Sequence, residues 1–97
     1  MRYVFTENAW ADYSWWEMHD RQGLKRVNQL LADCARNGYR GIGKPEALVG
    51  DLSGFWSRRV NDRDRLVYRI SGNDIEIIAC RFHYSASEPT PSGWDGG

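Results

Sequence analysis

The chain has 97 residues, and its 13 Lys and Arg balance its 13 Asp and Glu, so the formal net charge at pH 7 is zero. This length allows one hydrophobic core but not two. A neutral chain is not a general polyanion binder, so any nucleic-acid contact has to come from a local group of cations. No apolar run reaches the length of a membrane span and no signal-peptide pattern opens the chain. We therefore expect a cytoplasmic protein without membrane contact.

The basic side chains are unevenly spread. Residues 40–70 carry seven basic and four acidic side chains, whereas residues 1–39 carry five of each. A modest local excess of this kind indicates a site rather than a surface that binds any polyanion.

The two cysteines, Cys34 and Cys80, lie in apolar-patterned segments. There is no CxxC motif and no Cys/His spacing that suggests zinc. We expect two reduced, buried thiols that act as small hydrophobic residues. The sequence indicates no metal and no cofactor.

The N-terminal half predicts a strand and two helices. Residues 2–6 are typical of a short strand, and Thr6 can cap a helix that runs from Glu7 to about His19. Asp20 can cap a second, longer helix, which Gly38 is placed to end as a left-handed residue. The apolar residues at helical spacing are Trp10, Tyr13 and Trp16, followed by Leu24, Val27, Leu30, Leu31, Cys34 and Ala35. Two helices with almost no linker predict an αα-hairpin on one side of a sheet.

Residues 55–70 have the pattern of a β-hairpin. Two aromatic and β-branched runs, 55–60 and 66–70, flank a polar turn. With Arg59 opposite Arg65, one face carries Trp56, Arg58, Val60, Leu66, Tyr68 and Ile70, and the other carries Ser57, Arg59, Arg65 and Arg69. A slip of one residue would exchange the two faces, so burial selects this register. The hairpin should have one mostly apolar face and one exposed basic face.

The segments around the hairpin are less regular. Residues 38–45 contain three glycines and a proline and predict a loop, after which Glu46 should open one short turn through Leu52. Residues 75–84 predict a last strand, buried on both sides and therefore central in the sheet. Residues 85–97 are rich in Ser, Pro and Gly, and we expect them to be a disordered tail after one domain of residues 1–84.

Four residues, Glu46, Arg59, Arg65 and His83, could carry a reaction. Cleavage of RNA by its own 2′-hydroxyl needs a base for the 2′ proton, an acid for the departing 5′ oxygen, and cations for the charge on phosphorus. A carboxylate, a histidine and two arginines could supply all three without metal. The planar guanidinium suits phosphate because it donates two parallel hydrogen bonds.

Each candidate also has a structural interpretation. Glu46 could be a first-turn carboxylate favoured by a helix dipole. His83 could be a structural residue at a strand end, and Tyr84 could cap the core or face solvent. Arg59 and Arg65 could lie on a solvated face or form surface salt bridges with the aspartates of the intervening turn.

Four ordered blocks of the sequence resemble the YoeB/Txe toxins, which belong to the RelE/ParE superfamily of bacterial toxin–antitoxin systems. The blocks are Lys44-Pro45-Glu46-Ala47-Leu48, Leu52-Ser53-Gly54-Phe55-Trp56-Ser57-Arg58-Arg59, Arg65-Leu66-Val67-Tyr68 and Cys80-Arg81-Phe82-His83-Tyr84. The likeness covers residues 1–84 without a gap and includes Trp10, Asp12 and Tyr13.

This resemblance implies an α+β fold like that of microbial ribonucleases and RelE, with two N-terminal helices packed on a curved, mainly antiparallel sheet. It implies a ribosome-dependent endoribonuclease that cuts mRNA in the A site of the 70S ribosome without metal and so inhibits translation. It also implies a homodimer and a cognate YefM-type antitoxin, whose disordered C-terminal segment wraps the toxin.

The resemblance also implies a role for individual residues. Glu46 matches the general base, His83 the general acid and Arg65 the cation that stabilises the transition state. Tyr84 matches a residue that positions the substrate. The expected RNA contacts are Arg59, Lys44 and Arg58.

Two departures from the family pattern bear on function. Val49 and Gly50 stand where relatives often carry basic or polar residues, which implies fewer RNA contacts and a lower rate. The tail of residues 85–97 extends past the usual His-Tyr terminus. Two rival functions are a non-enzymatic inhibitor like the ParE branch, which binds DNA gyrase, and a degenerate domain that only binds an antitoxin. The Glu46 and His83 pair and the terminal His-Tyr argue against the first, because the ParE branch generally lacks them.

Overall fold

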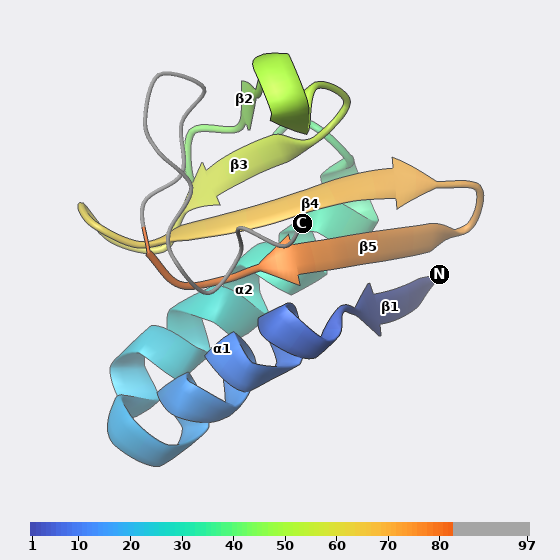
Figure 1. The fold of residues 1–97 in the computed structure, drawn as a ribbon. Coiled ribbons are helices and arrows are strands. Elements are labelled where there is room, and N and C mark those ends of the chain that lie inside the picture. Colours follow the sequence, from blue (N-terminus) through green and yellow to red (C-terminus); the bar gives the residue numbers. More distant parts are fainter. Residues whose placement is uncertain (83–97) are drawn as a thin grey trace.

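The computed structural model describes residues 1–82, which form two helices packed against a five-stranded sheet (Figure 1). In spatial order the strands are β1 (Arg2–Phe5), β5 (Asp74–Ala79), β4 (Arg65–Ser71), β3 (Trp56–Arg59) and β2 (Glu46–Ala47). Only β1 and β5 run parallel, and the other neighbours are antiparallel. The predicted α+β fold, with two N-terminal helices on a mainly antiparallel sheet, is confirmed.

Local capping signals define both helices. α1 (Glu7–His19) begins where the Thr6 hydroxyl accepts a hydrogen bond from the N–H of Ala9. α2 (Arg21–Asn37) begins where the Asp20 carboxylate accepts from Gly23, and it ends at Gly38, which has φ of 67°. The two caps and the terminating glycine are the residues that the sequence predicts. Neither helix of the described chain is long and apolar enough to cross a membrane.

The two helices approach closely because Gly23 lies against the indole of Trp16. A Cβ at position 23 would overlap with the six-membered ring of that indole, so only glycine fits without movement. Trp16 is itself buried in the core between the helices and the sheet. The buried core residues on this side are Ala9, Trp16, Val27, Leu30, Leu31, Cys34, Val60, Leu66, Tyr68, Ile75, Ile77 and Cys80. Of the apolar residues at helical spacing, Trp10 and Ala35 are exposed, and the others are buried or half-buried as predicted.

The hairpin of β3 and β4 has the predicted register, with Arg59 paired to Arg65. Its apolar face packs against the helices, as expected. Its other face is not simply basic, because a second apolar cluster forms there from Leu48, Val67 and Ala79. Phe55 and Leu52, the latter in the short 3-10 helix η1 (Gly50–Leu52), cover this cluster. The apolar side chains that β4 and β5 present on this face explain why the segment folds back over the sheet.

Two expectations about the elements are wrong. Glu46 does not open a helical turn; it lies in β2, because its backbone pairs with Ser57 of β3. The last strand ends at Ala79, earlier than predicted. It is an interior strand of the sheet, as expected, with β1 and β4 as its neighbours. A register shift between Val67 and Tyr68 indicates a β-bulge, which bends a strand. The predicted tail lies outside the described residues.

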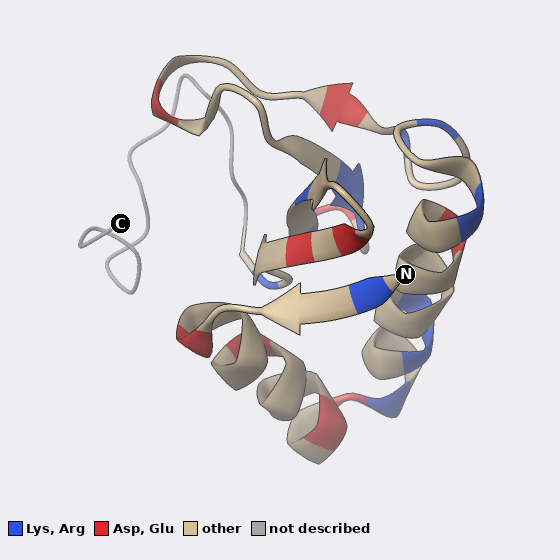
Figure 2. Cartoon of the chain, turned by 90° about the vertical axis from the view of Figure 1, so that its right-hand side faces the viewer, with Lys and Arg blue, Asp and Glu red and all other residues tan. Residues whose placement is uncertain are grey.

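The two helices differ in charge. α1 carries Glu7, Asp12 and Glu17 with no Lys or Arg, whereas α2 carries Arg21, Lys25, Arg26 and Arg36 against Asp33 alone. In Figure 2, α1 accordingly carries red segments without blue, and α2 carries mainly blue ones. Although the net charge of the chain is zero, an acidic helix therefore lies beside a basic one.

Candidate active site on the sheet

The pairing of β2, β3 and β4 brings three predicted site residues to one face. Glu46 lies opposite Ser57, and Arg59 lies opposite Arg65. Ser57 and Arg59 are two residues apart on β3, so they point to the same side of the sheet, as cross-strand partners also do. Glu46, Arg59 and Arg65 thus share the face opposite the helices. Same-face neighbours lie about 7 Å apart along a strand and about 5 Å apart across it, so these long side chains can reach one phosphate group.

Arg65 is the most constrained of the three. Its Nη1 lies within hydrogen-bond distance of the backbone carbonyls of Asn61 (2.8 Å), Asp62 (3.2 Å) and Asp64 (3.1 Å). Its backbone N–H donates to the carbonyl of Phe82 at 2.9 Å. The residue is only 7% exposed. The expectation of a solvated arginine is wrong here, because the turn folds over the guanidinium, which donates to three of its backbone carbonyls.

The charges around Arg65 have opposite effects on its guanidinium. Burial lowers its pKa, and so does the positive charge of Arg59, while nearby carboxylates that include Glu46 raise it. Glu46 is therefore close enough to act on Arg65 electrostatically. Within residues 1–82, neither Arg59 nor Arg65 forms an ion pair with a carboxylate. The salt bridges proposed for these two arginines as a structural alternative are absent from the described chain.

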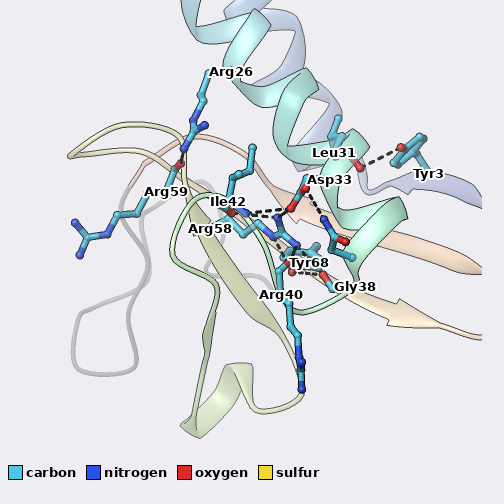
Figure 3. Close-up of polar contacts among 11 residues, drawn as sticks. Tyr3, Arg26, Leu31, Asp33, Gly38, Arg40, Ile42, Arg58, Arg59 and Tyr68 are labelled. Carbon is cyan, nitrogen blue, oxygen red and sulfur yellow. Dashed lines mark hydrogen bonds and ion pairs between the residues drawn. The ribbon is translucent and has the colours of Figure 1, made fainter.

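Arg58, one of the expected RNA contacts, lies in the core instead. Its side chain is fully buried, and its guanidinium forms five hydrogen bonds, one for each N–H donor of an arginine (Figure 3). The acceptors are the Tyr68 hydroxyl, the Asp33 carboxylate and the carbonyls of Gly38, Arg40 and Ile42. No donor remains for phosphate, so Arg58 is left out of the proposed site.

The side chain of the neighbouring Arg59 points away from the core. It is exposed, and Figure 3 shows its side chain extending away from the Arg58 network. Its backbone N–H donates to the carbonyl of Gly43 at 2.7 Å, which ties the loop before β2 to β3. Lys44 follows in this loop, exposed and with a left-handed φ of 52°. Lys44 and Arg59 thus lie on neighbouring segments at this end of the sheet.

The described chain ends beside Arg65, at Phe82. His83 and Tyr84 lie outside the described residues, and their roles stay predictions. Among residues 1–82, no group of three or more His, Cys, Asp or Glu side chains could hold a metal ion. Cys34 and Cys80 are both free and buried, as expected, and burial raises the pKa of each thiol.

The reasoning from sequence missed two buried carboxylates next to this site. Asp12 accepts a hydrogen bond from the backbone N–H of Cys80, and Asp64 accepts one from Phe82. The sequence signal for Asp12 was its place in the family likeness. For Asp64, its place among arginines suggests a surface salt bridge, and it does pair with the exposed Arg63, but its own side chain is buried and bonds the Phe82 backbone.

Comparison with solved structures shows a fold shared by bacterial toxins. YafQ of Escherichia coli matches with a TM-score of 0.65 at 15% identity, covering 86% of this chain and 94% of that chain, which is a likeness of fold alone. Residues 5–84 match the family described as the YoeB-like toxin of bacterial type II toxin-antitoxin system. The chain belongs to this family.

The relatives agree with this assignment. Toxin YoeB of Synechocystis sp. is 52% identical over 84 residues, which are 87% of this chain and 98% of the relative. Toxin YoeB of Streptomyces coelicolor is 50% identical over 84 residues, 87% of this chain and 100% of the relative.

Solved structures at higher identity show the same likeness. The YoeB/ParE toxin from Agrobacterium tumefaciens has a TM-score of 0.84 at 43% identity, covering 87% of this chain and 100% of that chain. From Staphylococcus aureus, a YoeB dimer has a TM-score of 0.82 at 41% identity, and a YoeB-YefM complex has 0.81 at 40%. Each covers 87% of this chain and 98% of the matched chain.

Proposed function

We propose that this toxin is a ribosome-dependent endoribonuclease that cleaves mRNA in the A site and so inhibits translation. The observation that carries the proposal is the shared sheet face of Glu46, Arg59 and Arg65. A carboxylate beside two guanidinium groups is a combination suited to proton transfer next to a phosphate. His83 follows directly in sequence on Phe82, whose carbonyl is bound to the backbone of Arg65.

In the proposed reaction, Glu46 accepts the proton of the 2′-hydroxyl, and the 2′ oxygen attacks the adjacent phosphorus. The bond from phosphorus to the 5′ oxygen breaks, and His83 donates a proton to that oxygen. The products are a 2′,3′-cyclic phosphate and a free 5′-hydroxyl. The chemistry needs no metal, because acid, base and cations all come from side chains.

Arg65 and Arg59 would stabilise the negative charge that develops on the phosphate oxygens. Arg65 is fixed in advance by the carbonyls of residues 61, 62 and 64, so little reorganisation is needed when the charge forms. Arg59 and Lys44 are exposed and suit contacts to the RNA backbone. Tyr84 would position the substrate beside them.

We also propose the assembly that the relatives suggest. The Staphylococcus aureus complex supports a YefM-type antitoxin as the partner that inhibits this toxin, and the dimer from the same organism supports a homodimer. A toxin that acts on ribosomes would work in the cytoplasm.

The test is toeprinting of one mRNA, free and on 70S ribosomes, with the wild-type chain and Glu46→Gln. We expect A-site cleavage on ribosomes, poor cleavage of free mRNA, and loss of cleavage in the variant. Glu76→Gln is the matched control, because Glu76 pairs with Arg69 on strands β5 and β4, outside the proposed site. Equal cleavage of free and bound mRNA would indicate a general ribonuclease. No cleavage by folded wild-type protein would favour a non-enzymatic inhibitor or a domain that only binds an antitoxin.

A further inference from the structure

Residues 80–82 leave the sheet after β5, and side chains from distant elements hold their backbone. The carbonyl of Cys80 accepts from the indole of Trp16 at 2.8 Å, and the N–H of Cys80 donates to the Asp12 carboxylate at 3.0 Å. Both Asp12 and Trp16 come from α1 and are buried. Cys80 is thereby anchored to the helix layer on its two polar backbone groups.

Phe82 is anchored on the opposite side, by the hairpin. Its N–H donates to Asp64 Oδ1 at 2.7 Å, and its carbonyl accepts from the backbone of Arg65 at 2.9 Å. Phe82 also has a φ of 71°, which is unfavourable for a residue with a bulky side chain. Such a conformation persists only where its surroundings hold it, and strained residues of this kind gather at functional sites.

Asp64 is itself rigidly held. Its Oδ2 accepts from the side-chain amide of Asn61 at 3.0 Å, and its backbone N–H donates to the side-chain oxygen of Asn61 at 2.7 Å. One carboxylate oxygen thus fixes the turn and the other fixes Phe82. The same Oδ2 also lies 3.6 Å from Nε of the exposed Arg63, but the Asp64 residue is only 1% exposed.

Arg81, which lies between the two anchored residues in the sequence, contacts two aromatic rings. Its guanidinium carbon lies 3.7 Å from the ring centre of Trp15 and 4.5 Å from that of Phe82. The contact with Trp15 adds a second link to α1, so Cys80, Arg81 and Phe82 each contact a helix or the hairpin. The next residue in the chain is the proposed general acid, His83.

We propose that Asp64 and Asp12 are positioning residues of the active site, which hold residues 80–82 so that His83 is presented to the phosphate bound by Arg65. This inference rests on the proposed function. Neither carboxylate touches the substrate: Asp64 acts through Phe82, and Asp12 acts through Cys80.

The experiment compares two ribosome-bound mRNAs, one with a normal linkage and one with a bridging 5′-sulfur at the cleaved position. A thiolate leaves without protonation, so the sulfur mRNA does not need the general acid. The variants are Asp64→Ala, Asp12→Ala and His83→Gln, assayed in single turnover under conditions where urea unfolding shows each to be folded. Asp74→Ala is the control, because it removes a hydrogen-bonded carboxylate at the start of β5, far along the strand from residues 80–82.

On the normal mRNA we expect Asp64→Ala to lose about 10²-fold in rate, as small misplacements of catalytic groups do. We expect Asp12→Ala to be slower than the wild type on the normal mRNA as well. On the sulfur mRNA, both variants and His83→Gln should recover most of the lost rate. Amide hydrogen exchange gives a readout independent of activity: Phe82 should lose protection in Asp64→Ala while Ile77 in β5 keeps it.

Two results would overturn the inference, and they are distinguishable. If the wild type cleaves normally but Asp64→Ala loses equally on both mRNAs, or loses nothing, the positioning role is wrong and the proposed function stands. If the wild type cleaves neither mRNA, the proposed function fails and the positioning role falls with it.

Discussion

The buried Arg58 network allows a sharp test of what stabilises this fold. Arg58→Met removes four hydrogen bonds that connect β3 to α2 and to the loop after it, and a fifth to Tyr68 of β4. It also leaves the Asp33 carboxylate without its cationic partner, with only the hydrogen bonds from Asn37 and Ile42. The guanidinium of Arg58 holds the pKa of Asp33 below its ordinary value, so that carboxylate is charged at neutral pH. Breaking a buried ion pair from one side costs about 3–5 kcal/mol, because the other charge stays buried.

A loss of about 3–5 kcal/mol is a large part of the total stability of a small domain, which is about 5–15 kcal/mol. It should lower the melting temperature by at least about 12 °C, at about 4–8 °C per kcal/mol for a domain of this size. The assay is urea unfolding at pH 7, supported by thermal melts.

Arg59→Met is the matched control, because Arg59 is the next residue but exposed, and it should change stability by less than about 0.5 kcal/mol. The double variant Arg58→Met with Asp33→Leu should recover part of the loss, because the unpaired charge is removed as well. The reasoning is refuted if Arg58→Met costs no more than Arg59→Met does.

Three further predictions concern the proposed site. Glu46→Gln and His83→Gln should each lower A-site cleavage by about 10²–10⁴-fold with little change in stability, which single-turnover assays and thermal melts measure together; wild-type rates would remove that residue from the mechanism. Arg65→Ala should lower stability by about 1–3 kcal/mol in urea, because the carbonyls of Asn61 and Asp62 lose their donor, and should also lower cleavage beyond the loss of folded protein; unchanged stability would contradict the observed contacts. Burial raises the pKa of Asp12 to about 6 from an ordinary value of 3.8, against the lowering effect of Arg81 and with a small contribution from Asp64. The stabilising effect of the protonated Asp12 is therefore complete below about pH 4 and lost as the pH rises through about 6, so Asp12→Asn should gain about 3 kcal/mol relative to the wild type between pH 3 and pH 8 in urea unfolding. If the unfolding free energies of Asp12→Asn and the wild type differ by the same amount at every pH in this range, Asp12 titrates alike in the folded and unfolded chain.

The parts that the sequence predicts correctly are those whose cause is local. Thr6, Asp20 and Gly38 set helix boundaries through bonds to residues at most four positions away. The register of β3 and β4 follows from a two-residue period and from a turn that joins neighbouring strands. These features depend on a few consecutive residues, so patterns along the chain are enough to place them.

The roles of the arginines could be decided only by the tertiary structure. Arg58 and Arg59 are adjacent and identical in type, yet one is buried and the other exposed. The difference comes from Asp33 and from carbonyls 16 to 20 residues away, which meet Arg58 only when α2 packs on the sheet. The spacing of residue types along the chain does not predict that a buried guanidinium will have a hydrogen-bond acceptor for each of its donors.

Contacts between residues far apart in the sequence also explain the conformations of Glu46 and Phe82. Glu46 is in a strand because Ser57 of β3 offers it a backbone partner, although its own neighbours suggest a helical turn. Phe82 takes a left-handed conformation because Asp64 and Arg65, 17 or 18 residues earlier, hold both of its polar backbone groups. The sequence by itself determined the helices, the hairpin and the residue types of the site. Long-range hydrogen bonds, which exist only once the layers have packed, decided which of those residues are free to meet a substrate.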